Sequence, residues 1–139
     1  KNGKGFYDYP ANKGPKTLWP GLADLVALKV TEAEPAAVEE LKKRFLYRQA
    51  VEAARCVAEG VVTDPRDGDV GAILGWGFAP WTGGPISLID TVGLAKFVEE
   101  CDRMAQAYGP RFAPPQLLRD MAARGETFYG NWKSGRKAA

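Results

Sequence analysis

The sequence predicts an all-α fold of about five helices with short connections, preceded by an extended N-terminal connector. From residue 35 onward, apolar residues recur every three or four positions, and glycines and prolines begin and end each such stretch. No stretch shows the apolar–polar alternation expected of a half-buried strand. A Rossmann-type nucleotide domain, which needs strands between its helices, is therefore not expected in these 139 residues.

The longest expected helix begins at Glu34-Pro35 and extends to Glu59, through helix-forming residues without internal glycine or proline. Gly60 provides its C-terminal stop. We expect this helix to be central to the core, because helical spacing gives it a wide apolar face. The predicted face consists of Val38, Leu41, Phe45, Leu46, Ala50, Ala53 and Val57.

Two further helices are expected over residues 64–74 and 85–91. Asp64 can accept hydrogen bonds from the free amides of the first turn, where Pro65 loses nothing by lacking an N–H. Asp90, near the end of the 85–91 helix, is expected to bond locally to backbone.

The clearest helix is predicted over residues 94–108, followed by a last one after Pro114-Pro115 that runs to about Arg124. In the last helix, Leu117, Leu118 and Met121 are expected to face inward. The tail over residues 134–139 is predicted to be disordered. The apolar face of the 94–108 helix consists of Leu94, Phe97, Val98, Cys101, Met104, Ala105 and Tyr108.

Residues 1–35 are rich in Gly, Pro, Lys and Asn and show no sustained period, which predicts an extended connector. Its apolar island, Leu22 to Val30, is expected to form a short helix or a docking segment. A weak internal echo relates the segment Gly5 to Tyr9 to the segment Phe128 to Trp132. Such a pair is typical of the ends of two successive copies of one module, although two Phe-Tyr dipeptides are also compatible with chance.

Composition excludes several classes of function. The 19 basic and 17 acidic residues give a net charge of +2, which does not favour nucleic acid as a partner. No apolar run is long enough to span a membrane, and no signal peptide follows the basic start. Cys56 and Cys101 lie far apart on expected helices and are predicted to be reduced core thiols, so we expect a soluble, cytoplasmic protein.

The chain has no histidine, which excludes a Ser-His-Asp triad and removes the commonest zinc ligand. Carboxylates remain as candidate acids, bases or metal ligands, namely Asp64, Asp67, Asp69 and Asp90. Helix capping explains Asp64 and Asp67 without further assumptions. No catalytic, cofactor-binding or metal-binding residue is therefore predicted in this chain.

The most unusual segment runs from Gly75 to Pro85 and combines four glycines and two prolines with three large aromatics. It is predicted to lack regular structure and to form a turn of special geometry. It contains neither GxGxxG nor GxxxxGK[ST], so a phosphate loop is not favoured. Trp76, Phe78 and Trp81 have two open interpretations: an apolar wall that faces an acyl chain or another domain, or aromatic filling of the core beneath the turn.

Several short motifs follow one another in a definite order. Asn2 to Tyr9 resembles a closing signature, Gly-x-Gly-Phe-Tyr-x-Tyr, and a second set of motifs follows after a linker. That set consists of Arg44, Glu52-Ala53, Glu59-Gly60-Val61, Asp69, Gly75-Trp76-Gly77-Phe78, Gly83-Gly84-Pro85 and Asp90-Thr91-Val92-Gly93. In this order and spacing the chain resembles the second C-terminal helical repeat of 3-hydroxyacyl-CoA dehydrogenases, as found in the multifunctional fatty acid β-oxidation protein.

The resemblance implies a helical fold of the 6-phosphogluconate dehydrogenase C-terminal-like type. It implies three segments: the end of a preceding repeat plus a linker over residues 1–35, the second repeat over 36–133, and a tail over 134–139. The parent would oxidise L-3-hydroxyacyl-CoA to 3-ketoacyl-CoA with NAD, fused to an enoyl-CoA hydratase. Its partners would be an upstream nucleotide-binding domain, the first helical repeat, the acyl-CoA substrate and a thiolase subunit.

The resemblance carries no catalytic residue over to this chain. The family's His-Glu pair lies on the nucleotide domain, and the position that matches its assisting Asn is Lys43, next to Arg44. Lys43 lacks a neutral amide, so this repeat is expected to be catalytically silent and to serve by packing against the first repeat. The alternative is an independent helical module that binds an acyl ligand or a partner protein through Trp76, Phe78 and Trp81.

Overall fold

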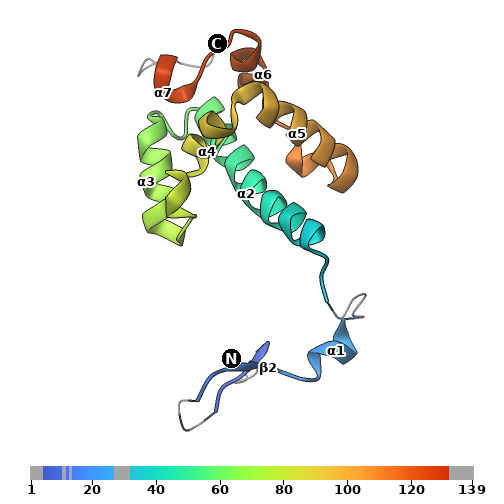
Figure 1. Cartoon of the computed structure of the whole chain (residues 1–139). Coiled ribbons are helices and arrows are strands. Elements are labelled where there is room, and N and C mark those ends of the chain that lie inside the picture. Colours follow the sequence, from blue (N-terminus) through green and yellow to red (C-terminus); the bar gives the residue numbers. More distant parts are fainter. Residues whose placement is uncertain (1–4, 11, 13, 27–31, 132–139) are drawn as a thin grey trace. The chain divides into compact units, whose positions relative to one another are not determined.

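The computed structural model describes residues 5–10, 12, 14–26 and 32–131 (Figure 1). The chain divides into two compact units, Lys1–Ala37 and Val38–Ala139. The predicted tail over residues 134–139 and the end of the apolar island, residues 27–31, lie outside the described residues.

The first unit contains a short antiparallel ladder, which the sequence did not predict. β1 (Tyr7–Asp8) pairs with β2 (Thr17–Leu18), so that Tyr7 lies opposite Leu18. Strands of two residues are too short for an alternating pattern to appear in the sequence. The described part of the apolar island forms α1 (Leu22–Leu25), in agreement with the expected short helix.

The second unit is helical, and five helices of eight or more residues occur among the described residues. They are α2 (Pro35–Ala58), α3 (Pro65–Trp76), α4 (Pro85–Val92), α5 (Leu94–Tyr108) and α6 (Gln116–Ala123), together with the 3₁₀ turns η1 (Pro80–Thr82) and η2 (Pro110–Phe112) and a last short helix, α7 (Phe128–Asn131). The predicted all-α class is confirmed. The 75–85 segment is more regular than predicted, because α3 continues through Trp76 and Pro80 starts η1.

Local capping explains why α3 begins where it does. Asp64 lies just before α3, and its carboxylate accepts a hydrogen bond from the Arg66 amide at 2.9 Å, while Pro65 occupies the first turn. The Arg66 guanidinium beside Asp64 lowers the pKa of that carboxyl to about 2. The prediction made from the Asp64-Pro65 pair is therefore confirmed.

The core lies between α2, α4, α5 and α6, and α4 contacts α3, α5 and α7 (Figure 1). The ring of Tyr47 on α2 stacks on Phe97 of α5, with ring centroids 4.5 Å apart. The fully or almost fully buried face of α2 consists of Tyr47, Ala50, Val51, Ala54 and Val57.

The predicted apolar face of α2 is only partly correct. Ala50 and Val57 are buried as expected, whereas Leu41 and Phe45 are exposed. Both sets follow helical spacing, so the sequence contains two apolar stripes and only one faces the core of this unit. None of the helices in the described part of the chain is long and apolar enough to cross a bilayer.

Candidate functional site

One buried carboxylate organises the start of α4. Asp69 on α3 accepts hydrogen bonds from the Ile86 amide at 2.7 Å and the Ser87 amide at 2.9 Å. It also accepts from the Ser87 hydroxyl at 2.6 Å and the Tyr129 hydroxyl at 2.6 Å. Gly84, the residue before α4, has no side chain that could cap this helix. Asp69, which lies on the neighbouring helix α3, accepts hydrogen bonds from the first free amides of α4 in its place.

Gly84 is required by this arrangement. Its backbone has φ +118°, a conformation that side-chain-bearing residues rarely adopt, and a Cβ atom here would lie 2.4 Å from the side chain of Asp69. The Gly-Gly-Pro motif therefore brings the backbone against a buried carboxylate. Pro85 then occupies the first turn of α4, where an N–H would have no partner within the helix.

A second carboxylate holds the last helix. Asp90 on α4 accepts hydrogen bonds from the amides of Phe128 and Tyr129, each at 2.9 Å. The expectation that Asp90 bonds locally was wrong, because its partners lie at the start of α7, 38 and 39 residues along the chain. Asp69 and Asp90 together tie α3, α4 and α7 into one network, which leaves these two candidates in helix-capping roles.

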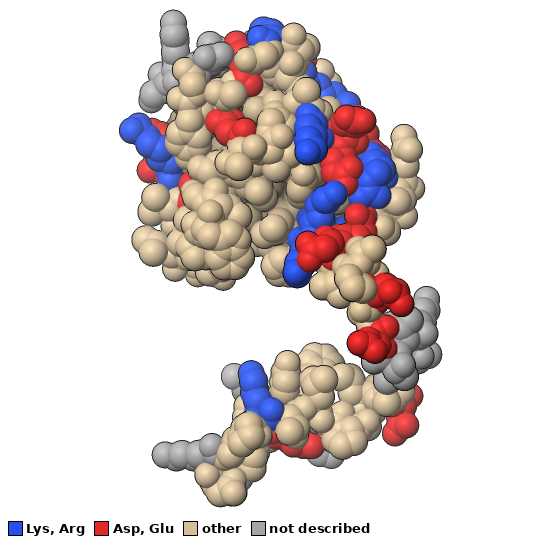
Figure 2. Space-filling view, in the orientation of Figure 1, with Lys and Arg blue, Asp and Glu red and all other residues tan. Residues whose placement is uncertain are grey.

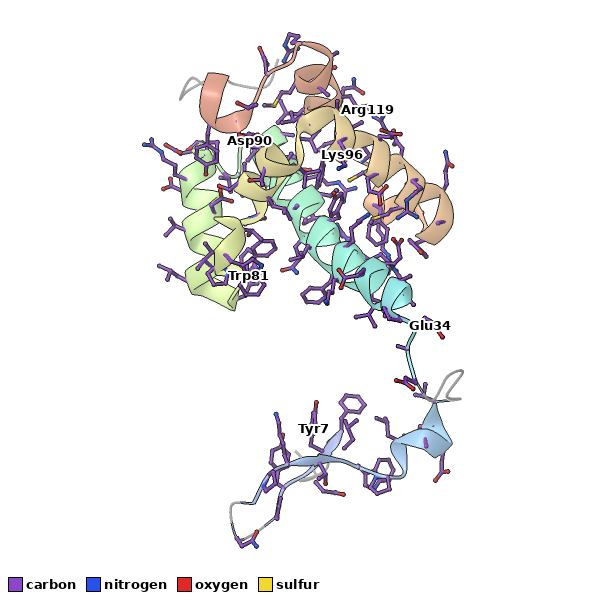
Figure 3. The ribbon with its side chains drawn as sticks, in the orientation of Figure 1. Tyr7, Glu34, Trp81, Asp90, Lys96 and Arg119 are labelled. Atoms are coloured by element: carbon purple, nitrogen blue, oxygen red, sulfur yellow. The ribbon has the colours of Figure 1, made fainter. Side chains whose placement is uncertain are left out.

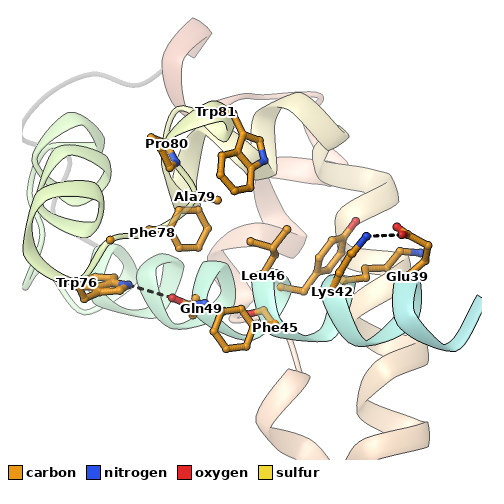
Figure 4. Close-up of a pocket in the computed structure, with 13 residues that line it drawn as sticks. Glu39, Lys42, Phe45, Leu46, Gln49, Trp76, Phe78, Ala79, Pro80 and Trp81 are labelled. Carbon is orange, nitrogen blue, oxygen red and sulfur yellow. Dashed lines mark hydrogen bonds and ion pairs between the residues drawn. The ribbon is translucent and has the colours of Figure 1, made fainter. Parts of the chain in front are cut away.

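The three aromatics of the turn line one groove of about 760 Å³ between the turn and α2 (Figure 4). Trp76 and Trp81 are 64 % and 84 % exposed, whereas Phe78 is 2 % exposed. The two interpretations of the turn thus apply to different residues: Phe78 packs inward, and the two tryptophans present their rings to the outside.

The opposite wall of the groove comes from α2, which the sequence did not indicate as part of the site. Phe45, 71 % exposed, lies beside Leu46 and Gln49 along this wall. The Gln49 side-chain oxygen accepts a hydrogen bond from the Trp76 indole N–H at 3.0 Å and so fixes one wall against the other. The available signal was the second apolar stripe of α2, which contains Phe45.

Charged side chains gather on the side of the second unit where α2 and α5 lie, beside a broad uncharged area (Figure 2). Arg103 bonds both Glu40, at 2.7 Å, and Glu100, at 2.8 Å, and Lys43 bonds Glu100 at 2.8 Å. Arg103 first, and Lys43 second, lower the pKa of Glu100 to about 2. Lys43 on α2 is therefore engaged in an ion pair with Glu100 on α5.

The remaining candidates do not form a reactive centre. Cys56 and Cys101 are both free thiols, and burial raises the pKa of the Cys101 thiol to about 12. The described residues contain no group of three or more side chains able to hold a metal ion. Figure 3 shows Asp90 and Lys96 well separated from Trp81, whereas the charged side chains of Glu39, Lys42 and Lys43 line part of the groove along α2.

The turn also does not fit the pyrophosphate of NAD. Three of its amides are already bonded: those of Gly77 and Phe78 donate to carbonyls of α3, and that of Gly84 donates to the Thr82 hydroxyl oxygen. A phosphate cradle needs free amides at the start of a helix. The Gly77, Phe78 and Gly84 amides are therefore not available to a phosphate group.

A family model described as "3-hydroxyacyl-CoA dehydrogenase, C-terminal domain" matches residues 41–134. The chain belongs to this family. The resemblance drawn from the motifs is thus confirmed. The matched region contains all of the groove lining except Glu39, the aspartates Asp69 and Asp90, and every helix from α3 to α7.

Relatives with the printed name "fatty acid oxidation complex subunit alpha" include proteins of Shewanella amazonensis and Vibrio cholerae. The first is 46 % identical over 131 residues and the second 43 % over 129 residues. Each alignment covers 93 % of this chain and 18 % of the relative. This 3-hydroxyacyl-CoA dehydrogenase C-terminal domain therefore spans less than a fifth of the length of these relatives.

Proposed function

We propose that this chain is the second helical repeat of a longer fatty acid β-oxidation protein and that its role is to pack against the preceding repeat. In this proposal residues 1–35 end the preceding repeat and link it to the second repeat, residues 36–133. The parent oxidises L-3-hydroxyacyl-CoA to 3-ketoacyl-CoA with NAD in the cytoplasm, and it carries an enoyl-CoA hydratase. The names and lengths of the relatives support this assignment.

A catalytically silent role agrees with the chemistry of the described side chains. The sequence has no histidine, Asp69 and Asp90 are occupied by helix caps, and Lys43 is paired with Glu100. The acid and base, the NAD site and the contacts with acyl-CoA are assigned to the upstream domains, and a thiolase subunit is a further proposed partner.

The aromatic groove is the observation that carries the packing role. Phe45, Trp76 and Trp81 expose most of their side chains within one patch. Leu41, which is also exposed, lines a second, smaller hollow together with Phe45. Burying a large apolar side chain contributes about 1.5–3 kcal/mol, and tryptophan is enriched among residues that dominate interface energies. A patch of this composition is typical of an interface between domains rather than of a free surface.

The test compares two changes in the full-length protein and in this chain alone. Phe45→Ser combined with Trp81→Ser removes the two most exposed rings of the groove, and Leu74→Ser, at an exposed site outside the groove, is the control. The double variant is expected to lower the melting temperature of the full-length protein by several degrees and to leave that of the isolated chain nearly unchanged. Equal effects of the double variant and the control would contradict the packing role.

A second candidate function, acyl-ligand binding, is favoured by the size and lining of the groove. Small-molecule sites typically enclose about 300–1,000 Å³ and are mostly apolar. Trp76 and Trp81 provide the readout, because an acyl chain in the groove would change their fluorescence. Saturable quenching by a long-chain acyl-CoA, abolished by the double variant and absent with free CoA, would support binding; no change up to millimolar ligand would exclude it.

A further inference from the structure

The second hollow, of about 330 Å³, lies between α2 and η2 and differs from the aromatic groove in its charge. Three arginines line it, Arg44 and Arg48 from α2 and Arg111 from η2. Among the described residues of its lining there is no aspartate or glutamate, so no carboxylate faces the arginines from its walls. The rest of the lining consists of Leu41, Phe45, Gln49 and Phe112.

Aromatic rings hold two of these arginines without using their N–H groups. The Arg44 guanidinium carbon lies 4.0 Å from the centroid of the Tyr108 ring, and that of Arg111 lies 5.4 Å from the centroid of Phe112. A guanidinium over a ring face is attracted by the charge distribution of the ring, so its N–H donors remain available. Tyr108 is itself held, because its hydroxyl donates to Glu40 at 2.9 Å.

Neighbouring cations on α2 are paired, whereas Arg44 and Arg111 are not. Arg48 bonds Glu52 at 2.7 Å, and Lys43 has its partner on α5. Neither Arg44 nor Arg111 has a hydrogen bond or ion pair with any described residue, and the Arg44 Nε atom is buried without an acceptor. A buried N–H group without an acceptor is costly, so this guanidinium gains from an acceptor brought to the hollow.

We propose that this hollow binds a small phosphate monoester, with its phosphate bonded by Arg44 and Arg111 and its organic part against Phe45. A phosphate monoester offers three acceptor oxygens, so guanidinium groups from two different elements can bond it together. A carboxylate offers two oxygens, and a single guanidinium already matches them. Arg48, although shared with Glu52, adds to the positive charge around the phosphate.

The apolar part of the lining distinguishes an ester from free inorganic phosphate. Phe45 is 71 % exposed and Leu41 is 54 % exposed, and both line the hollow beside the arginines. Covering these side chains with an aromatic or aliphatic group removes apolar area from water, which inorganic phosphate cannot do. The inference does not rest on the packing role of the aromatic groove, because neither Arg44 nor Arg111 lines that groove.

Isothermal titration calorimetry of this chain with phenyl phosphate tests the inference. One saturable site is expected, and Arg44→Gln and Arg111→Gln are each expected to weaken binding by about tenfold or more. Arg44→Lys keeps the charge but loses the planar fork, so an intermediate loss is expected. Lys96→Gln is the matched control, because it removes one positive charge on α5 outside the lining, and it should change the affinity by less than about twofold.

Two further probes separate the parts of the ligand. Benzoate, which replaces the phosphate by a carboxylate, and inorganic phosphate, which lacks the ring, are each expected to bind at least about tenfold more weakly than phenyl phosphate. Benzoate binding as tightly as phenyl phosphate would overturn the choice of phosphate, and equally tight inorganic phosphate would overturn the role of Phe45.

The site itself is overturned if phenyl phosphate gives no saturable binding, or if Lys96→Gln weakens it as much as Arg111→Gln does. Melting temperatures of the variants show whether each one folds. Arg111 is exposed on η2, so Arg111→Gln decides the outcome where Arg44→Gln fails to fold. Arg111→Gln leaves Trp76 and Trp81 intact, so its result is independent of the groove experiment.

Discussion

The region where α3 passes into α4 has two sides, one that faces α7 and one that faces α2, and the two sides differ in how completely their side chains are partnered. On the side of α7, Asp69 accepts four hydrogen bonds and the tyrosine at position 129 closes the network. On the side of α2, Trp76 and Trp81 stay largely exposed although they belong to the same short segment. The first side is complete within this unit, whereas the second offers apolar area that nothing in the described residues covers.

The difference separates residues that the unit needs to fold from residues available to a partner. Substitutions on the Asp69 side should damage the isolated chain, because buried donors lose their acceptor. Substitutions at the exposed tryptophans should leave the isolated chain intact and matter only in the longer protein. The following changes test this division from the largest expected effect to the smallest.

Asp69→Ala is expected to have the largest effect. It removes the acceptor of two amides and two hydroxyls in a site where Asp69 is 3 % exposed. A buried donor left without a partner costs about 1–3 kcal/mol. The bond from the Ile86 amide is buried and the other three are partly buried, so a loss of roughly 4 kcal/mol is expected in urea unfolding of this chain. Asp69→Asn retains one oxygen and should lose less; equal stability of Asp69→Ala and the native chain would refute the network.

Gly84→Ala is expected to cost about 2–4 kcal/mol, from strain at a positive φ and from the clash with Asp69. Gly71→Ala is the matched control, because Gly71 lies within α3 and a Cβ there meets nothing within 4 Å. That control is expected to be neutral or to stabilise the chain by up to about 1 kcal/mol. Similar melting temperatures for the two variants would show that the close approach does not matter.

The lowered pKa of the Glu100 carboxyl predicts that the free energy of unfolding depends modestly on pH. Its pKa in the folded protein is about 2, below the ordinary value of 4.5, so its contribution is present above about pH 4.5 and is lost as the pH falls toward 2. Since Arg103 is partly exposed, solvent screening limits the expected contribution to about 1 kcal/mol.

Urea unfolding of Glu100→Gln and of the native chain at pH 7 and pH 3 measures this contribution. The difference in free energy of unfolding between the two proteins should be smaller at pH 3. A difference between Glu100→Gln and native protein that is the same at both pH values would exclude the proposed ion-pair effect.

Trp81→Ala is expected to have the smallest effect on the isolated chain, within about 0.5 kcal/mol, because the side chain is 84 % exposed. Phe78→Ala, a few residues earlier in the same turn, should cost about 3–5 kcal/mol, since Phe78 is 2 % exposed. Differential scanning calorimetry of the two variants compares the two sides of the turn directly. Equal losses would mean that Trp81 already has a partner within this chain.

Local signals in the sequence predicted most of the fold. Asp64 and Pro65 mark the start of α3 because a cap acts within one turn, and Gly60 and Gly125 follow helices because each adopts a positive φ. The partners of Asp69 and Asp90 lie 17 to 60 residues away, so no local pattern could reveal them. Capping across elements depends on the tertiary arrangement that it stabilises.

Of the two walls of the aromatic groove, the sequence indicated only the one formed by the turn. Trp76, Phe78 and Trp81 stand out by composition, but the contribution of Phe45 and Gln49 required the packing of α2 against the turn. The helical period predicts a core position for Leu41 and Phe45, because an apolar stripe on the surface of a helix has the same period as one that faces a core. Periodicity alone does not say which surface a stripe will meet.

The position of Phe128 and Tyr129 at the very end of the helical unit also bears on its synthesis. During synthesis α3 and α4 leave the ribosome before Phe128 and Tyr129 do. Asp69 and Asp90 therefore lack the hydrogen-bond donors of these two residues until nearly all of the described helices have emerged. A nascent chain that stops short of Phe128 lacks a fully buried ring of the core and both amide donors to Asp90.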